Sequence, residues 1–154
     1  NTVNFLTWAH AAFDGISDHT TPLNHTKAVG APAIEHRPAL LQGPGSALDK
    51  TLFSTSLNFD LAVYECFAPL TSGGRIEVVK NVLELQHGEH DIGLINTVPS
   101  ALKALLEVDG LPKSVHTVNV AGEALKRSLV ESLFEKTGVQ RLCNLYGPSE
   151  TTTY

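Results

Sequence analysis

Blocks of apolar and polar residues alternate from about position 51 onward in a way that predicts strands followed by helices. Short runs rich in β-branched and aromatic residues are typical of strands, and longer stretches with apolar residues three or four positions apart are typical of amphipathic helices. Strands are expected over residues 51–56, 75–79, 92–97, 115–121 and 140–146, with helices over about 60–70, from Pro99 onward and from about Leu125 to Gly138. The expected fold class is therefore α/β, a mostly parallel sheet with helices on both faces.

The chain before position 51 follows a different pattern. Apolar residues at helical spacing predict a helix over about residues 3–13. From residue 14 to residue 50, proline, glycine and histidine recur without sustained periodicity. We expect residues 14–50 to form a mobile insertion that the fold does not need, within a single domain spanning residues 1–154.

Composition narrows the classes of function. The 154 residues are 42% hydrophobic and 18% charged, as in a soluble globular protein. A formal net charge of -5 argues against nucleic acid as a partner, and no apolar run is long enough to span a membrane. Only two cysteines are present, Cys66 and Cys143, both in apolar sequence surroundings typical of buried residues. A disulfide scaffold is therefore excluded, and a reduced, cytoplasmic setting is expected.

Polar residues gather where the expected strands end. In open parallel sheets, ligands bind beyond the carboxyl ends of the strands. Asp60 stands between a strand and a helix, where it could cap the helix or offset the charge of a ligand cation. Asn96 and Asn119 lie at the ends of two other expected strands, where a lone asparagine usually forms a turn. These three residues are the first candidates for a binding site.

The run NLYGPSETTT, residues 144–153, is the most specific feature of the sequence. Tyr146 offers a flat face for a nucleotide base, and Gly147 turns the chain. Ser149 offers a hydroxyl to phosphate oxygens, and Glu150 offers a carboxylate to a hard cation. The same composition is also that of an ordinary surface loop, so the residues alone leave both interpretations open.

A metal site at His87 and His90 is not favoured. Gly88 breaks a helix between them and no third ligand is near in sequence, so the run QHGEHD is interpreted as a solvated turn. The sequence also contains no GxSxG nucleophile elbow, no glycine-rich phosphate loop with lysine and no CxxC motif.

Four segments, in their order and spacing, closely resemble the central part of the adenylation domains of nonribosomal peptide synthetases, within the acyl-adenylate-forming superfamily. They are LFSTSLNFDLAVYECFAPLTSGGRIEVV, INTVPSALKALLE, VNVAGEAL and NLYGPSETTTY. The opening NTVNFLTW fits the helix that follows the family's phosphate loop. The resemblance covers residues 1–13 and about 51–154, and it implies a partial adenylation-domain core.

Such domains activate an amino acid with ATP and Mg²⁺ as aminoacyl-AMP, and pass the aminoacyl group to the phosphopantetheine thiol of a carrier protein. The implied partners are the amino acid, ATP, and the carrier and condensation domains of a parent synthetase. The resemblance also implies that Asp60 pairs with the substrate ammonium group and that Glu150 holds Mg²⁺. The remaining implied residues are Leu61, Tyr64, Asn96, Asn119, Ala121, Leu145, Thr153 and Tyr154 for the side-chain pocket, and Gly122, Glu123, Asn144, Tyr146, Gly147, Ser149 and Glu150 for ATP.

The implied pocket suits a small amino acid. Four of its residues are bulky and leave little volume for a side chain, namely Leu61, Tyr64, Leu145 and Tyr154. Its two asparagines bring amides but no charge, which argues against a charged substrate. As a pattern, the pocket resembles the family's pockets for alanine or glycine, and less closely those for cysteine. Alanine is therefore expected first and glycine second.

Several parts of the family pattern are not in this sequence. The phosphate loop is expected before Asn1, and the ribose-binding aspartate, the hinge and the small C-terminal domain with its lysine are expected after Tyr154. The isolated chain is therefore expected to be inactive. Two alternatives stay open. One is an acyl-CoA ligase-type relative, whose acid substrate has no ammonium group for Asp60, and the other is a non-catalytic α/β binding module.

Overall fold

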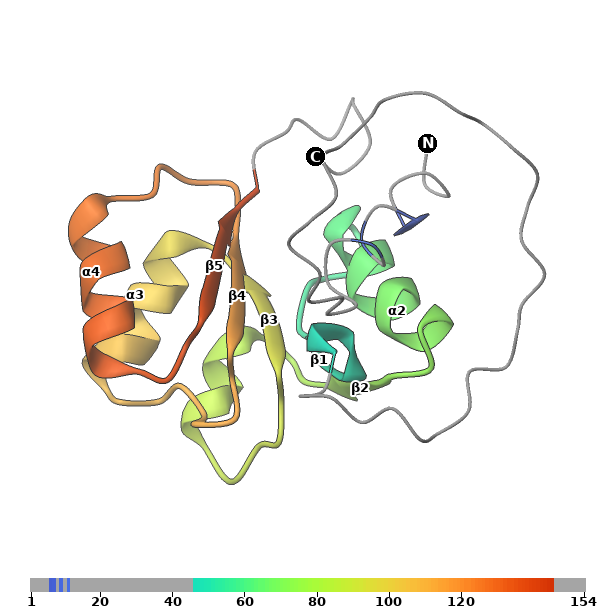
Figure 1. The fold of residues 1–154 in the computed structure, drawn as a ribbon, viewed down its shortest axis with the longest axis horizontal. Helices are drawn as coiled ribbons and strands as arrows, with labels where there is room; N and C mark the ends of the chain where they lie inside the picture. The colour runs from blue at the N-terminus through green and yellow to red at the C-terminus, as the bar shows by residue number, and fades with distance from the viewer. Residues whose placement is uncertain (1–5, 8, 10, 12–45, 146–154) are drawn as a thin grey trace, which may run out of the picture.

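The computed structural model describes residues 6, 7, 9, 11 and 46–145, which contain one five-stranded sheet (Figure 1). All the strands run parallel, in the order β2-β1-β3-β4-β5. They are β1 (Lys50–Phe53), β2 (Arg75–Val78), β3 (Leu94–Thr97), β4 (Thr117–Val120) and β5 (Arg141–Asn144). β1 meets β3 at one residue pair, Thr51↔Leu94, whereas every other pair of neighbouring strands is in register over four residue pairs.

Helices cover both faces of this sheet, as the sequence predicts. Within residues 46–145 they are α2 (Leu61–Thr71), α3 (Pro99–Glu107), α4 (Arg127–Lys136) and the short 3₁₀ helices η1 (Ala47–Asp49) and η2 (Val82–Gln86). α2 lies against one face, and α3 and α4 lie side by side against the other (Figure 1). Residues 6, 7, 9 and 11 are also helical. The α/β fold class is confirmed.

Each face of the sheet has its own core. Successive side chains of a strand point to opposite faces, so neighbouring residues enter different clusters. In β3, Ile95 joins a large aliphatic cluster with residues of α3 and α4, whereas Leu94 joins a smaller cluster with Tyr64 of α2. The fully buried members of the larger cluster are Leu52, Ile95, Leu102, Leu105, Val118, Val120 and Leu133.

The strands are shorter than the sequence pattern predicts, and side-chain acceptors explain where two of them end. β1 stops at Phe53 because the backbone N–H groups of Ser54 and Thr55 donate to the carboxylate of Glu65. β3 begins after Ile92 because the Ile92 N–H donates to the hydroxyl of Ser114. β-branched residues therefore predict the position of a strand, but competing hydrogen bonds set its length.

The insertion expected over residues 14–50 ends earlier in the structure. Ser46 caps η1 by accepting a hydrogen bond from the backbone N–H of Leu48 at 3.2 Å, and Leu48 is fully buried. Strand β1 follows directly, so residues 46–50 belong to the fold. Residues 14–45 lie outside the described residues, and their expected mobility stays a prediction.

Two expectations from composition concern the cysteines and membranes. Cys66 and Cys143 are both free thiols and both half-buried, and Cys143 packs against the cluster on the α2 face. Among the helices that the structure describes, none combines the length and the apolar character that crossing a membrane requires.

Candidate functional site

The direction in which successive strands are added to the sheet reverses between β1 and β3. The carboxyl ends of these two strands are therefore where a ligand is expected to bind. The connection from β1 to β2 runs through α2 on one face, and the connection from β3 to β4 runs through α3 on the other (Figure 1). In open parallel sheets, ligands bind beyond the carboxyl ends of the strands at such a topological switch point. Here the point is flanked by Ser54 and Thr55 after β1 and by Val98 after β3.

Asp60 immediately precedes α2 at this edge. Its backbone carbonyl accepts from the N–H of Val63 at 2.9 Å, as expected at the start of a helix. Its side chain is half-buried but makes no capping hydrogen bond. The pairing of this carboxylate with a substrate ammonium group stays a prediction. The next residue, Leu61, packs against the cluster on the α2 face.

Tyr64, Asn96 and Asn119 form a buried polar row between α2 and the sheet. Asn96 and Asn119 lie opposite each other in β3 and β4, and Asn119 Nδ2 donates to Asn96 Oδ1 at 2.9 Å. The same nitrogen donates to the Tyr64 hydroxyl at 3.4 Å. All three residues are at most 2% exposed, and burial raises the pKa of Tyr64 well above its ordinary value. The turn interpretation of the two asparagines is wrong, because both lie within strands.

This polar row has unused hydrogen-bonding capacity. Asn96 Nδ2 and Asn119 Oδ1 are buried and have no hydrogen-bond partner among the described residues. Leaving such an atom unpaired costs about 1–3 kcal/mol, and native proteins keep few of them. Asn119 Oδ1 is therefore the kind of group that a bound polar ligand would satisfy, whereas the Asn96 nitrogen has the Glu65 carboxylate as a neighbour.

The loops after β4 and β5 reach the same edge of the sheet. The N–H of Ala121 donates to the last carbonyl of β3 at 3.1 Å, and the N–H of Leu145 donates to the last carbonyl of β4 at 2.8 Å. Gly122 follows with a φ of 79°, a left-handed conformation that disfavours any side chain. Asn144 is the exposed last residue of β5. The structure thus brings these four expected site residues to the end of the sheet that carries Asn96 and Asn119.

Glu123 has a task that the sequence did not indicate. Its carboxylate accepts from the backbone N–H of Ser100 at 2.9 Å and from the Ser100 hydroxyl at 2.7 Å. Ser100 lies in the first turn of α3, so Glu123 satisfies a free N–H there and opposes the positive end of the helix dipole. The carboxylate of Glu123 therefore ties the loop after β4 to α3, and only its backbone is left for a ligand.

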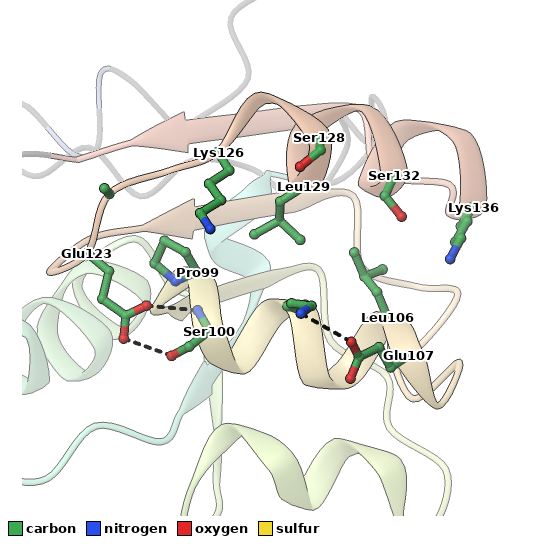
Figure 2. Close-up of a pocket in the computed structure, with 12 residues that line it drawn as sticks. Pro99, Ser100, Leu106, Glu107, Glu123, Lys126, Ser128, Leu129, Ser132 and Lys136 are labelled. Carbon is green, nitrogen blue, oxygen red and sulfur yellow. Dashed lines mark hydrogen bonds and ion pairs between the residues drawn. The ribbon is translucent and has the colours of Figure 1, made fainter.

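A cavity of about 560 Å³ lies between α3 and α4, on the face of the sheet away from the polar row (Figure 2). Its lining includes the apolar side chains of Leu106 and Leu129 and the ammonium groups of Lys126 and Lys136. Of the residues that the sequence singles out for ligands, only Glu123 lines it. This cavity is therefore not the expected amino-acid pocket.

Several expected site residues lie outside the described residues. They are Tyr146, Gly147, Ser149, Glu150, Thr153 and Tyr154. Within residues 46–145 and the four described helical positions before them, no group of three His, Cys, Asp or Glu side chains could hold a metal ion. The assignment of Mg²⁺ to Glu150 stays a prediction.

His87 and His90 belong to a structured turn rather than to a metal site. His90 Nδ1 lies 2.5 Å from Glu77 Oε1, and its Nε2 lies 2.8 Å from the carbonyl oxygen of His87. The hydrogen bond to Glu77 is the main cause that raises the pKa of His90. This contact joins the turn to β2, which makes it more ordered than the solvated turn expected from the sequence.

The buried polar residue that the sequence analysis did not single out is Glu65. It is a fully buried carboxylate in the middle of α2, beside the polar row. Its neighbours in sequence are mostly apolar, and they predict a helix that only packs against the sheet. The signal for Glu65 was its isolation, since it is the one charged residue in the helical run LAVYECFAPLT.

Comparisons with known proteins agree with this fold. The model of the family described as AMP-binding enzyme matches residues 22–154. One of the linear gramicidin synthase proteins of Brevibacillus parabrevis is 49% identical over 105 residues, which are 67% of this chain and 2% of the relative. The AMB antimetabolite synthetase AmbB of Pseudomonas aeruginosa is 47% identical over 105 residues, 67% of this chain and 8% of the relative.

A solved structure shows the same arrangement. The adenylation domain AlmE of Vibrio cholerae, in complex with glycyl-adenosine-5'-phosphate, superposes with a TM-score of 0.58 at 29% identity, over 70% of this chain and 22% of that one. The chain therefore belongs to the AMP-binding enzyme family, as part of an adenylation domain of the nonribosomal peptide synthetase type. It spans only a small share of the length of the relatives it matches.

Proposed function

We propose that this chain contributes the amino-acid site of an adenylation domain that activates a small amino acid, alanine first and glycine second, as aminoacyl-AMP. In the complete protein, the aminoacyl group would pass to the phosphopantetheine thiol of a carrier domain, beside condensation domains, in the cytoplasm. ATP and Mg²⁺ complete the reaction, in which positioning and charge neutralisation supply most of the catalysis.

The observation that carries the proposal is the polar row at the switch point. Tyr64, Asn96 and Asn119 are buried together, and none carries a charge at neutral pH. A charged substrate side chain would need a counter-ion there, because an unpaired buried charge is costly. The row therefore favours an uncharged substrate side chain.

Asp60 is the reason to propose an amino acid as the substrate in place of an acyl or aryl acid. Its half-buried carboxylate stands at the same edge and does not serve as a helix cap. A carboxylate in this position suits the α-ammonium group, which an acyl or aryl acid lacks. The relative AlmE was solved with glycyl-adenosine-5'-phosphate, the adenylate of the smallest amino acid, and this supports a small substrate.

The backbone at Gly122 suits a flat adenine ring. Among the described residues, a Cβ built there would meet only Val98, at an ordinary contact distance of 3.6 Å. Asn144 is exposed near it, and the loop that carries Tyr146 follows. We assign the base to Gly122, the Glu123 backbone, Asn144 and Tyr146, the phosphates to Gly147 and Ser149, and Mg²⁺ to Glu150.

The test is amino-acid-dependent exchange of ATP and pyrophosphate by the complete domain. Alanine should give the highest kcat/KM and glycine the next, with modest discrimination because one methyl group in a pocket is worth only about 1–3 kcal/mol. Asp60→Asn should lower the rate about 100-fold or more, since the substrate cation then lacks its partner. The matched control, Asp109→Asn, changes an exposed aspartate after α3 and should leave exchange unchanged.

Two results would contradict the proposal. A preference for phenylalanine, leucine, lysine or glutamate would show that the pocket is not small and uncharged. Exchange that depends on an acyl or aryl acid, and that Asp60→Asn leaves intact, would favour an acyl-CoA ligase-type activity. The isolated 154-residue chain should show no exchange at all, and activity in it would contradict the assignment of phosphate-binding elements to other parts of the protein.

A further inference from the structure

Glu65 is a buried carboxylate to which neither the family resemblance nor the proposed pocket assigns a role. It is fully buried in α2, directly after Tyr64. Burying a carboxylate is costly unless several donors satisfy it, and a helix that only needs to pack against a sheet gains more from an apolar residue. Its contacts therefore indicate a task other than packing.

Three donors at the carboxyl end of β1 satisfy this carboxylate. Glu65 Oε2 accepts from the backbone N–H of Ser54 at 2.9 Å and from that of Thr55 at 2.8 Å. Glu65 Oε1 accepts from the Thr55 hydroxyl at 3.0 Å. The segment that these bonds hold leads into Asp60, and α2 begins at the residue after Asp60. Glu65 lies in α2, where the connection from β1 ends, and its carboxylate holds the start of that connection.

The second neighbour of Glu65 is Asn96 of the polar row. Burial raises the pKa of Glu65, and the donors from Thr55 and Ser54 and the Asn96 amide partly offset that rise. Asn96 Oδ1 accepts from Asn119, so the amide nitrogen is the end of Asn96 that is left to interact with Glu65. That nitrogen does not complete a hydrogen bond with any described group. The carboxylate therefore favours one of the two orientations of the Asn96 amide.

We propose that Glu65 is a positioning residue of the amino-acid site, which holds the β1–α2 connection that carries Asp60 and orients the Asn96 amide. It acts through these two groups and does not touch the substrate. The proposal rests on the proposed function, because it assigns Glu65 to the same pocket. Its effect should therefore fall on binding of the amino acid and not on binding of ATP.

Glu65→Gln separates positioning from simple packing. Glutamine has nearly the same shape, and its one carbonyl oxygen can still accept from Ser54 and Thr55. Its NH₂ group replaces one carboxylate oxygen, so the side chain offers the Asn96 amide an uncharged and therefore weaker acceptor. We expect the connection to persist and the Asn96 amide to lose its preferred orientation.

The experiment measures exchange kinetics and thermal unfolding on the complete domain. Glu65→Gln should raise the KM for the amino acid roughly 5- to 100-fold, the range expected when a buried polar group loses its partner. The KM for ATP and the Tm should stay close to those of the wild type. The matched control is Glu107→Gln, an exposed glutamate of α3, which should change neither KM. An unchanged amino-acid KM in Glu65→Gln, or an equal rise in both KM values, overturns the proposal.

A second variant keeps the test decisive if Glu65→Gln does not fold. Thr55→Val removes only the hydroxyl donor to Glu65 Oε1 and keeps the backbone donors. It should raise the amino-acid KM a few-fold without changing the KM for ATP, and no change would overturn the proposal. Asp60→Asn in the same assay tests the proposed function separately. If Asp60→Asn has no effect, the substrate assignment fails, whatever Glu65→Gln does.

Discussion

The two faces of the sheet are built from different kinds of side chains. The face toward α3 and α4 is aliphatic, with Leu52, Ile95, Val118 and Val120 buried among helix leucines. On the face toward α2, the same strands bury Thr51, Asn96, Thr117 and Asn119, and the helix adds Tyr64 and Glu65. Both faces are buried, but most of the buried polar groups, which usually cost stability, lie on the face toward α2.

The difference indicates which face we expect to contribute to ligand binding. An aliphatic face gains free energy from every buried methylene, and it explains why the domain is folded. A polar face of equal burial gains less and must satisfy each donor and acceptor. Its hydrogen bonds converge on Asn96 and on the segment that precedes Asp60, at the carboxyl end of the strands.

The largest expected effect is a loss of stability when a buried side chain on the aliphatic face is truncated. Leu105 of α3 is fully buried in the aliphatic cluster. Leu105→Ala should lower the free energy of unfolding of the complete domain by about 2–5 kcal/mol, because it leaves a cavity. Chemical denaturation measures this loss, and the folded fraction should keep its KM for the amino acid. Lys103→Ala, an exposed change in the same helix, is the control. A loss below about 1 kcal/mol would show that α3 is not a principal source of stability.

A smaller loss of stability with a larger loss of binding is expected on the polar face. Asn119→Ala removes the donor to Asn96 and Tyr64 and should cost about 1–3 kcal/mol of unfolding free energy. Its amino-acid KM should rise at least as much as in Glu65→Gln. The neighbouring change Val118→Ala faces the aliphatic cluster and should lower stability alone. If both variants raised the amino-acid KM equally, the two faces would not have the separate roles described here.

The smallest effect is expected at a site that belongs to neither face. The hydrogen bond that His90 donates to Glu77 raises the pKa of His90, so the protonated form stabilises the folded state. That stabilisation is fully present below the unfolded-state pKa of about 6.5 and is lost as the pH rises through the higher folded-state value. His90→Gln should therefore lower the Tm more at about pH 6 than at about pH 8.5. Thermal unfolding at the two pH values measures this, and exchange activity should not change.

A Tm difference that is the same at both pH values would contradict that assignment. His116 offers an internal check, since burial lowers its pKa and its contribution has the opposite sign. His116 contributes stability that increases as the pH rises through its unfolded-state pKa of about 6.5. The two histidines should therefore give Tm differences with opposite dependence on pH.

Hydrophobic periodicity predicted the sheet well because it reports burial. Each of the five expected strands and the helices between them are present, in an α/β arrangement. Their ends were predicted less well, because a strand ends where another acceptor takes its N–H. Ser54 and Ile92 show this, since one donates to Glu65 and the other to Ser114. Such partners are distant in sequence and have no periodic signal.

The candidate site also contains some residues whose place the sequence predicted and others whose contacts it did not. The position of Asp60 before a helix and the asparagines near strand ends could be read from local order, and the structure brings them to one edge. The role of Glu123 as the acceptor for Ser100 could not, because it depends on the distance between two loops after different strands. The sequence did not predict the hydrogen bonds of Glu65, because a single charged residue among apolar ones does not identify its partners.

The single residue pair between β1 and β3 makes that junction the weakest seam of the sheet. Asp60, Tyr64 and Glu65 are carried by the half that contains β1 and α2, whereas Asn96 and Asn119 are carried by the half that contains β3 and β4. Fewer paired residues oppose a small sliding of the two halves at this junction than at any other pair of neighbouring strands in the described sheet, and such a sliding would change the distance between these groups. The size of a pocket built across such a seam is therefore adjustable by substitutions in the core behind either half, as well as by substitutions in its own wall.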